Sequence, residues 1–148
     1  MFGVCLTYTK DRELAQDILH DGFFKVFKKF DKYDSSWSIN AWIRRIIVNT
    51  AIDHFRKTNR ISNVDFQESA YLAGSYDETS EISKTSDLSE IINMLPNGAK
   101  TVFNLYTVEG YKHQEIADML EISVGTSKSQ LSKAKSVLRD LVNKYYIR

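Results

Sequence analysis

Residues 115–135 read Glu115-Ile-Ala-Asp-Met-Leu-Glu-Ile-Ser-Val-Gly-Thr-Ser-Lys-Ser-Gln-Leu-Ser-Lys-Ala-Lys135, and this stretch decides the fold. The apolar spacing of Ile116, Ala117 and Leu120 predicts a short helix, which a tight turn ending at Ser123 separates from a second helix. Ser123 suits the N-cap of the second helix, because its hydroxyl can accept a hydrogen bond from an unpaired backbone amide. Two helices joined in this way predict a helix-turn-helix.

The second helix has two chemically different sides. Its apolar seam comprises Val124, Ser127, Leu131, Ala134, Leu138 and Leu141. Thr126, Ser129 and Lys133 point away from this seam, and Gln130 flanks them. Small hydroxyl side chains beside lysines allow a helix to enter the DNA major groove and to reach phosphates and base edges. The alternative is an ordinary amphipathic helix with a solvated lysine face, but the pattern favours DNA recognition.

Charge is unevenly distributed along the 148 residues, although the net charge is only +1. Residues 37–60 contain five Arg or Lys and one acid, and residues 126–148 contain six and one. Residues 61–90 between them contain seven acids and one lysine. Two basic modules separated by an acidic joint therefore describe the chain better than its net charge does.

Several classes of protein are disfavoured by composition. Cys5 is the only cysteine, so no intrachain disulfide can form and an intracellular, cytoplasmic chain is expected. His20, His54 and His113 lack metal-ligand spacing, and we expect no metal, cofactor or small-molecule substrate. No apolar run approaches the ~20 residues that a membrane-spanning helix needs.

Helical periodicity dominates the rest of the chain and predicts an all-α fold of two small domains. Helices are expected at about 11–30, capped by Asp11, at about 39–57, and again from residue 88, with a helix junction at Pro96. The predicted organisation is a first domain at 1–60, a flexible acidic linker at 61–87 and a second domain at 88–148. The buried side of the 11–30 helix should comprise Ala15, Ile18, Leu19, Phe23, Val26 and Phe30.

Two further helix faces are candidate binding surfaces. On the 39–57 helix, Asn49, Asp53 and Arg56 form a stripe together with Arg45 and Trp42. This stripe fits a nucleic-acid face and a structural role equally well; in the structural role Asp53 pairs with Arg56 or Lys57, and Trp42 belongs to the core. The outward face of the 11–30 helix is acidic and carries an exposed aromatic residue, a combination that favours contact with protein over DNA. Its residues are Glu13, Asp17, His20, Asp21, Phe24 and Lys28.

The whole chain resembles a bacterial extracytoplasmic-function (ECF) sigma factor. Three segments in the family's order carry the resemblance. They are Asp11-Arg-Glu-Leu-Ala-Gln-Asp-Ile-Leu-His-Asp-Gly-Phe-Phe-Lys-Val-Phe27, Ala41-Trp-Ile-Arg-Arg-Ile-Ile-Val-Asn-Thr-Ala-Ile-Asp-His-Phe-Arg56 and residues 95–138. The resemblance implies a subunit that directs core RNA polymerase to specific promoters and has no catalytic activity, and it also implies an anti-sigma partner.

The resemblance assigns a role to each candidate surface. The Glu13, Asp17, His20, Asp21 and Phe24 face would dock on the clamp helices of the largest polymerase subunit. Arg45, Asn49, Asp53 and Arg56, together with the loop at 31–38, would read the −10 promoter element and capture an unstacked base. The helix-turn-helix would read the −35 element through Thr126, Lys128, Ser129, Gln130 and Lys133.

This sequence departs from the family pattern at several positions. The family's first helix begins upstream of Met1, so the very N-terminal part of the first domain is expected to be missing. Lys112 stands where a capping serine is common, Glu121 replaces a glycine in the turn, and Ser127 replaces an apolar residue on the buried seam. These replacements predict a somewhat less stable second domain.

Two other functions are alternatives to a sigma factor. A stand-alone helix-turn-helix regulator would bind duplex DNA without polymerase, and it would leave the acidic helix face with Phe24 unused. A metal-dependent nuclease would have to use Asp17, His20, Asp21 or Asp53, but these lie on solvent-facing helix stripes with no catalytic spacing. The sigma factor is therefore the preferred interpretation.

Overall fold

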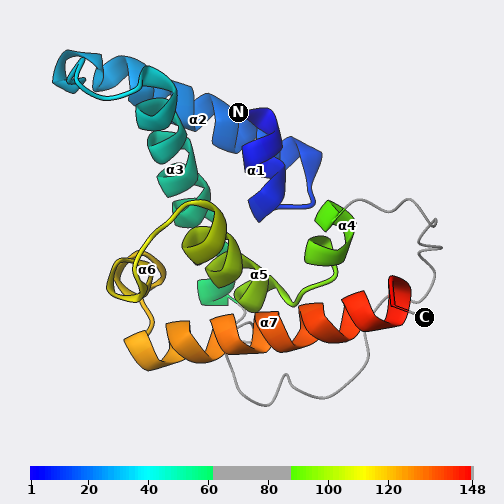
Figure 1. The fold of residues 1–148 in the computed structure, drawn as a ribbon. Helices are drawn as coiled ribbons and strands as arrows, with labels where there is room; N and C mark the ends of the chain where they lie inside the picture. Colours follow the sequence, from blue (N-terminus) through cyan, green and yellow to red (C-terminus); the bar gives the residue numbers. More distant parts are fainter. Residues whose placement is uncertain (62–87, 148) are drawn as a thin grey trace. The chain divides into compact units, whose positions relative to one another are not determined.

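The computed structural model describes residues 1–61 and 88–147, and every regular element in these two ranges is helical (Figure 1). The all-α fold expected from the sequence is therefore confirmed. The chain divides into two compact units, Met1–Ile61 and Ser62–Arg148. The linker predicted at 61–87 lies, beyond Ile61, outside the described residues. In the described ranges no helix combines the length and apolar character needed to cross a membrane.

The first unit is a three-helix arrangement with a short 3-10 turn. Its elements are α1 (Phe2–Tyr8), α2 (Arg12–Lys28), the 3-10 turn η1 (Phe30–Lys32) and α3 (Ile39–Ile61). Helix α2 packs along α3, and α1 packs against both. The core of this unit consists of Cys5, Tyr8, Ala15, Ile18, Val26, Ile47, Val48, Ala51 and Ile52.

Both ends of α2 have identifiable physical causes. Asp11 is the N-cap, as predicted, because its Oδ1 accepts hydrogen bonds from the backbone N–H of Glu13 at 2.9 Å and of Leu14 at 3.3 Å. The expectation that Phe30 belongs to the buried side of this helix is wrong, since Phe30 is 55% exposed. The helix ends at Lys28, so the helical repeat that placed Phe30 inward no longer applies to the η1 turn.

Gly22 sets how closely α2 approaches α3. A Cβ atom at this position would overlap the Cδ1 methyl of the fully buried Ile47 and would lie 3.6 Å from the Ile47 Cα. The missing side chain therefore lets the backbone of α2 come close to α3. The apolar pattern of the sequence does not mark this residue, because glycine contributes nothing to a hydrophobic stripe.

The second unit packs three short helices against one long helix. Its described elements are α4 (Leu88–Asn93), α5 (Asn97–Phe103), the π-helical turn η3 (Asn104–Val108), α6 (His113–Leu120) and α7 (Val124–Tyr145). Helix α7, drawn in orange to red, contacts α4, α5 and α6 (Figure 1). Leu95, Ala99 and Ala134 form a buried cluster, surrounded by Ile92, Phe103, Val137 and Leu138.

The helix junction predicted at Pro96 is confirmed. Helix α4 ends at Asn93, and Pro96 is the N-cap of α5, with its carbonyl accepting from the Lys100 N–H at 2.8 Å. Proline suits this position because it has no backbone N–H that would need a partner there.

We predict that Gly22→Ala lowers the stability of the first unit. Overpacking against Ile47 should cost about 1–3 kcal/mol, offset by the gain of about 1 kcal/mol that alanine has over glycine inside a helix. Ile47→Val removes the methyl that the new Cβ would overlap, so the double variant should be more stable than Gly22→Ala alone. Urea unfolding of the three variants checks this. A double variant less stable than Gly22→Ala would contradict the inference that Gly22 lets α2 pack closely against Ile47.

Candidate nucleic-acid and protein-binding surfaces

The helix-turn-helix is formed by α6, a tight turn and α7. Ser123 caps α7 as predicted, since its Oγ accepts from the Thr126 N–H at 3.0 Å. Glu121 takes the left-handed conformation in the turn, at φ 56° and ψ 44°, where a residue with a Cβ loses about 1–2 kcal/mol. Lys112 makes no side-chain cap hydrogen bond to α6, as its replacement of a capping serine predicts, but the Glu115 carboxylate accepts from the Lys112 backbone N–H at 2.8 Å.

A polar contact between the two helices of the motif satisfies the serine on the buried seam. Ser127 is fully buried, and its Oγ lies 2.9 Å from Nδ1 of His113, the first residue of α6. The His113 ring in turn stacks on Tyr106, with 4.6 Å between the ring centroids. Burying a hydroxyl costs less when the hydroxyl is hydrogen-bonded, so the contact with His113 reduces the cost of placing Ser127 on the buried seam.

The outward side of α7 carries most of the residues predicted to read the −35 element. Lys128 and Ser129 are exposed, while Thr126 and Lys133 are half-buried. The Ser129 hydroxyl donates to the Thr126 carbonyl at 3.0 Å. This side of the helix thus presents two lysines and two hydroxyl groups.

Gln130 does not belong to that side, which corrects the prediction. Gln130 is only 6% exposed, and its buried Oε1 has no hydrogen-bond partner among the described residues. Because α7 packs against both α5 and α6, its buried arc is wider than the apolar seam alone suggests. Gln130 falls within this arc and is therefore not presented on the outward side of α7.

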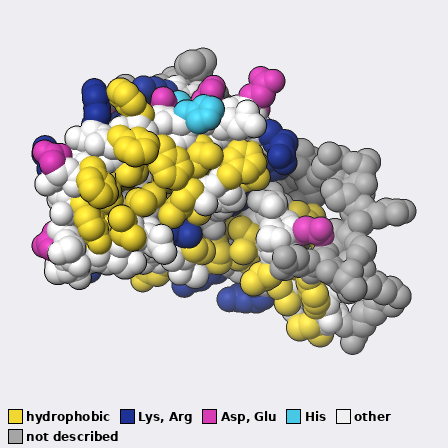
Figure 2. Space-filling model, turned by 90° about the horizontal axis from the view of Figure 1, so that it is seen from above, with side chains coloured by type: hydrophobic (Ala, Val, Ile, Leu, Met, Phe, Trp, Pro, Cys, Tyr) yellow, Lys and Arg dark blue, Asp and Glu magenta, His cyan; other side chains and the backbone are white. Residues whose placement is uncertain are grey.

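The predicted protein-contact side of α2 is exposed. Glu13, Asp17, His20 and Asp21 are all accessible, and Phe24 is 62% exposed, with the Lys28 Nζ 4.8 Å from its ring centroid. Figure 2 shows one face of the molecule on which hydrophobic side chains gather in a broad patch with charged side chains at its edge.

Sequence reasoning missed a second exposed aromatic residue, Phe27. It lies three residues after Phe24 on α2 and is 77% exposed. Its spacing from Phe24 was the available signal, since residues three apart lie on the same side of a helix.

Aromatic packing organises the loop between α2 and α3. Trp42 lies 5.1 Å from Tyr33 and 6.4 Å from Phe30 between ring centroids. The Tyr33 hydroxyl donates to the Trp37 carbonyl at 2.6 Å, and the Trp37 side chain is exposed. The Asp34 carboxylate accepts from the Ser36 N–H at 2.9 Å, and this backbone bond, together with the Ser36 hydroxyl, lowers the Asp34 pKa. These contacts link the loop to Trp42 of α3 and link its own residues to one another.

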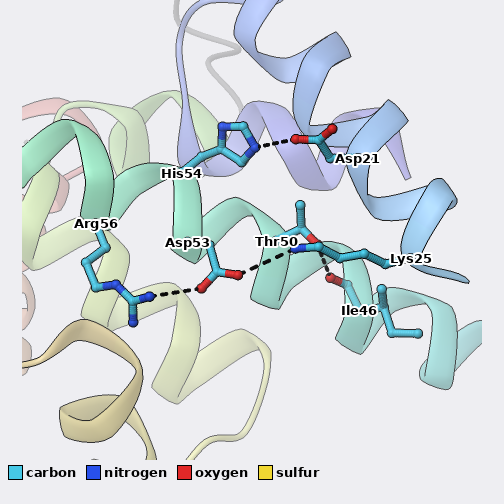
Figure 3. A network of polar contacts seen from close by, with 7 residues as sticks. All are labelled: Asp21, Lys25, Ile46, Thr50, Asp53, His54 and Arg56. Atoms are coloured by element: carbon cyan, nitrogen blue, oxygen red, sulfur yellow. Dashed lines mark hydrogen bonds and ion pairs between the residues drawn. The ribbon is translucent and has the colours of Figure 1, made fainter. Parts of the chain in front are cut away.

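Two polar bridges join α2 to α3 (Figure 3). Asp53 Oδ2 lies 3.5 Å from the Lys25 Nζ, and its Oδ1 lies 3.4 Å from the Arg56 Nη2. His54 Nε2 lies 2.8 Å from the Asp21 Oδ2. Asp53 therefore makes the structural pairing with Arg56 that the sequence allowed, and it also pairs with Lys25, which sequence reasoning missed because the two residues lie 28 positions apart.

A notch opens between α2 and α3 at these bridges. Its volume is about 380 Å³, and its lining comprises Asp21, Phe24, Lys25, Asp53, His54, Arg56 and Lys57. The remaining residues of the predicted α3 stripe, Arg45 and Asn49, are exposed. Within residues 1–61 and 88–147, no group of three or more His, Cys, Asp or Glu side chains could hold a metal ion.

Comparison with known proteins identifies both units. The family "Sigma-70 region 2" matches residues 1–61, and "Sigma-70, region 4" matches residues 85–138. RNA polymerase sigma factor SigV of Bacillus subtilis is 28% identical over 93% of this chain and 81% of its own length. ECF RNA polymerase sigma factor SigM of the same organism is 25% identical over 97% of this chain and 89% of its own.

A solved structure has the same fold. It is the sigma factor RpoE of Bartonella quintana, crystallised with the anti-sigma factor NepR. The likeness has a TM-score of 0.56 at 22% identity and covers 96% of this chain and 89% of the other.

We predict that replacing His113 lowers the stability of the second unit more than replacing Ser127 does. His113→Phe keeps a ring on Tyr106 but leaves the Ser127 hydroxyl buried without a partner, which should cost about 1–3 kcal/mol, whereas Ser127→Ala should cost about 1 kcal/mol. Adding Ser127→Ala to His113→Phe should restore part of the lost stability, as measured by urea unfolding. Strictly additive losses would show that the two side chains do not depend on each other.

Proposed function

The chain belongs to the sigma-70 family as an RNA polymerase sigma factor of the extracytoplasmic-function type, and we propose that its three exposed helix faces divide polymerase docking from promoter reading. As a sigma factor, the protein directs core RNA polymerase to specific promoters and initiates transcription. In the proposed division, the first unit contacts polymerase and the −10 element, and the second unit contacts the −35 element.

The polymerase-docking surface is the exposed side of α2. It comprises Glu13, Asp17, His20, Asp21, Phe24 and, in addition, Phe27. Acidic side chains repel the DNA backbone, whereas exposed aromatic residues inside a charged rim are typical of protein–protein contacts. The clamp helices of the largest polymerase subunit are the proposed partner of this surface.

The −10 reader is the exposed stripe of α3 with the aromatic loop before it. Arg45 and Asn49 are accessible for phosphate and base-edge contacts. Asp53 holds Arg56 and Lys25 beside them. Unstacking a base costs a few kcal/mol, and exposed aromatic side chains such as Trp37 can compensate for this cost by stacking on the extruded base.

The −35 reader is the outward side of α7. Thr126, Lys128, Ser129 and Lys133 form it, and the buried Gln130 is removed from the assignment. Lysines would contact phosphates there, and hydroxyl groups are small enough to let the helix enter the major groove.

One observation carries this proposal: the acidic and aromatic side of α2 differs sharply in charge from the lysine and hydroxyl side of α7. A stand-alone DNA-binding regulator would need only the α7 side. We therefore propose that the protein acts in the cytoplasm as a polymerase subunit without catalytic activity of its own. An anti-sigma factor that covers these surfaces is a further proposed partner.

We predict that Asp17→Lys/Asp21→Lys abolishes promoter-directed transcription in an assay with purified core polymerase. Charge reversal on the docking surface should remove polymerase binding, because it replaces two exposed acids by cations on the proposed contact side of α2. Glu90→Lys/Asp140→Lys reverses two exposed acids of the second unit and should retain activity. Full activity of the first variant would refute the docking surface. Tight binding to duplex DNA without any binding to polymerase would favour the stand-alone regulator.

We also predict that Lys128→Ala weakens promoter binding by the holoenzyme and reduces its salt dependence. Losing one phosphate contact should make the slope of log K against log salt shallower by about 0.9. Lys144→Ala removes the same charge about 24 Å further along α7, beyond the proposed −35 reader, so its slope should match that of the unmodified protein. Equal slopes for both variants would argue against a DNA contact at Lys128.

A further inference from the structure

The docking surface on α2 is supported from α3 through His54. The His54 Nε2 lies 2.8 Å from the Asp21 Oδ2, although the two residues are 33 positions apart. Figure 3 shows the imidazole of His54 and the carboxylate of Asp21 pointing toward each other from the two helices. Because an ionised carboxylate only accepts hydrogen bonds, the Nε2 carries the hydrogen and donates it.

His54 is more buried than Asp21, as expected if His54 supports Asp21 from behind the surface. The His54 side chain is 24% exposed and the Asp21 side chain is 59% exposed. His54 is thus set back against the helices, while Asp21 projects to the surface at the rim of the notch next to Phe24. In the described part of the chain, the contact from His54 engages only Oδ2, which leaves the Asp21 Oδ1 for an outside donor.

The close approach at Gly22 explains why this contact is possible. Gly22 follows Asp21 directly, and its missing Cβ brings α2 against Ile47, two helical turns before His54 on α3. A short aspartate side chain can therefore reach a residue on the neighbouring helix. A larger residue at position 22 would push the helices apart and lengthen the hydrogen bond.

We propose that His54 is a positioning residue for polymerase docking, because it holds the Asp21 carboxylate in one orientation with its second oxygen available to a cationic side chain of polymerase. The proposal rests on the docking role of Asp21 given above. A surface side chain that is already fixed loses less conformational entropy when a partner binds. Immobilising one side chain corresponds to about two- to tenfold in affinity, so this is the loss expected when His54 is removed.

A purely structural bridge between the helices is the competing explanation, and it makes different predictions. It would lower stability without changing the affinity of the folded protein for polymerase. Lys25→Met provides the comparison, because it removes the neighbouring bridge to Asp53 without touching Asp21. If His54 only joined the helices, Lys25→Met and a His54 variant should behave alike in polymerase binding.

The test measures the affinity of the full chain for purified core polymerase, without DNA, for His54→Leu, His54→Gln, Asp21→Asn and Lys25→Met. His54→Gln offers an amide N–H of similar reach, and thermal unfolding shows which variants are folded. We expect a two- to tenfold weakening for His54→Leu, a return toward the original affinity for His54→Gln, and no change for Lys25→Met. In the Asp21→Asn background, His54→Leu should have little further effect, because the two act as one unit.

Each other outcome is decisive. If Asp21→Asn weakens binding but His54→Leu does not, the docking role of Asp21 stands and the positioning role of His54 is refuted. Equal weakening by His54→Leu with and without Asp21→Asn would show that His54 acts independently of Asp21, which also refutes it. If Asp21→Asn itself leaves affinity unchanged, the docking assignment of Asp21 fails and the inference fails with it. If His54→Leu does not fold, His54→Gln is compared with His54→Asn, whose shorter side chain cannot reach Asp21. Higher affinity for polymerase in His54→Gln than in His54→Asn would support the positioning role, and equal affinity would refute it.

Discussion

The packing of α2 against α3 at Gly22 is the constraint on which the first unit depends. Because Gly22 has no side chain to keep Ile47 away, the two helices come close enough for short polar side chains to meet across them. The Asp21–His54 and Lys25–Asp53 contacts both lie within a turn of this glycine on α2. Through them, a residue assigned to polymerase docking and a residue assigned to promoter reading are each held by the neighbouring helix.

In the second unit, two helices are also joined by a specific contact, but this contact is a buried hydrogen bond instead of a close approach at a glycine. There the buried contact between Ser127 and His113 joins the two helices of the helix-turn-helix, and the stacked Tyr106 ring fixes the plane of the imidazole. A hydrogen bond with defined geometry restricts the rotation of α7 more than apolar contact alone does. Lys128 and Ser129 are consequently presented to solvent in a defined direction. In both units, then, a histidine contacts the neighbouring helix beside a surface assigned to sigma-factor function.

Local signals in the sequence predicted the helical architecture well, and they failed where packing decides. Asp11 and Ser123 were identified as caps because a cap depends on backbone groups only two or three residues away. The helical repeat predicts a buried Phe30, but α2 ends before this residue and Phe30 is exposed. The same kind of pattern predicts an exposed Gln130, but both α5 and α6 pack against α7 and Gln130 is buried. The pattern at Lys112 indicates a missing cap because a lysine side chain cannot accept from a backbone amide, whereas the structure shows the Glu115 carboxylate accepting from the Lys112 N–H.

Sequence patterns alone were enough to predict the all-α class, helices close to α2 and α3, the helix junction at Pro96, the turn before Ser123, the separation of charge along the chain and the resemblance to sigma factors. These features follow from periodicity, capping and composition, which act over a few residues or can be counted. Only the tertiary structure decided which side chains meet: Asp21 with His54, Lys25 with Asp53, and His113 with Ser127. Such partners lie 14 to 33 residues apart, and whether they touch depends on the distance and angle between packed helices, which no local pattern specifies.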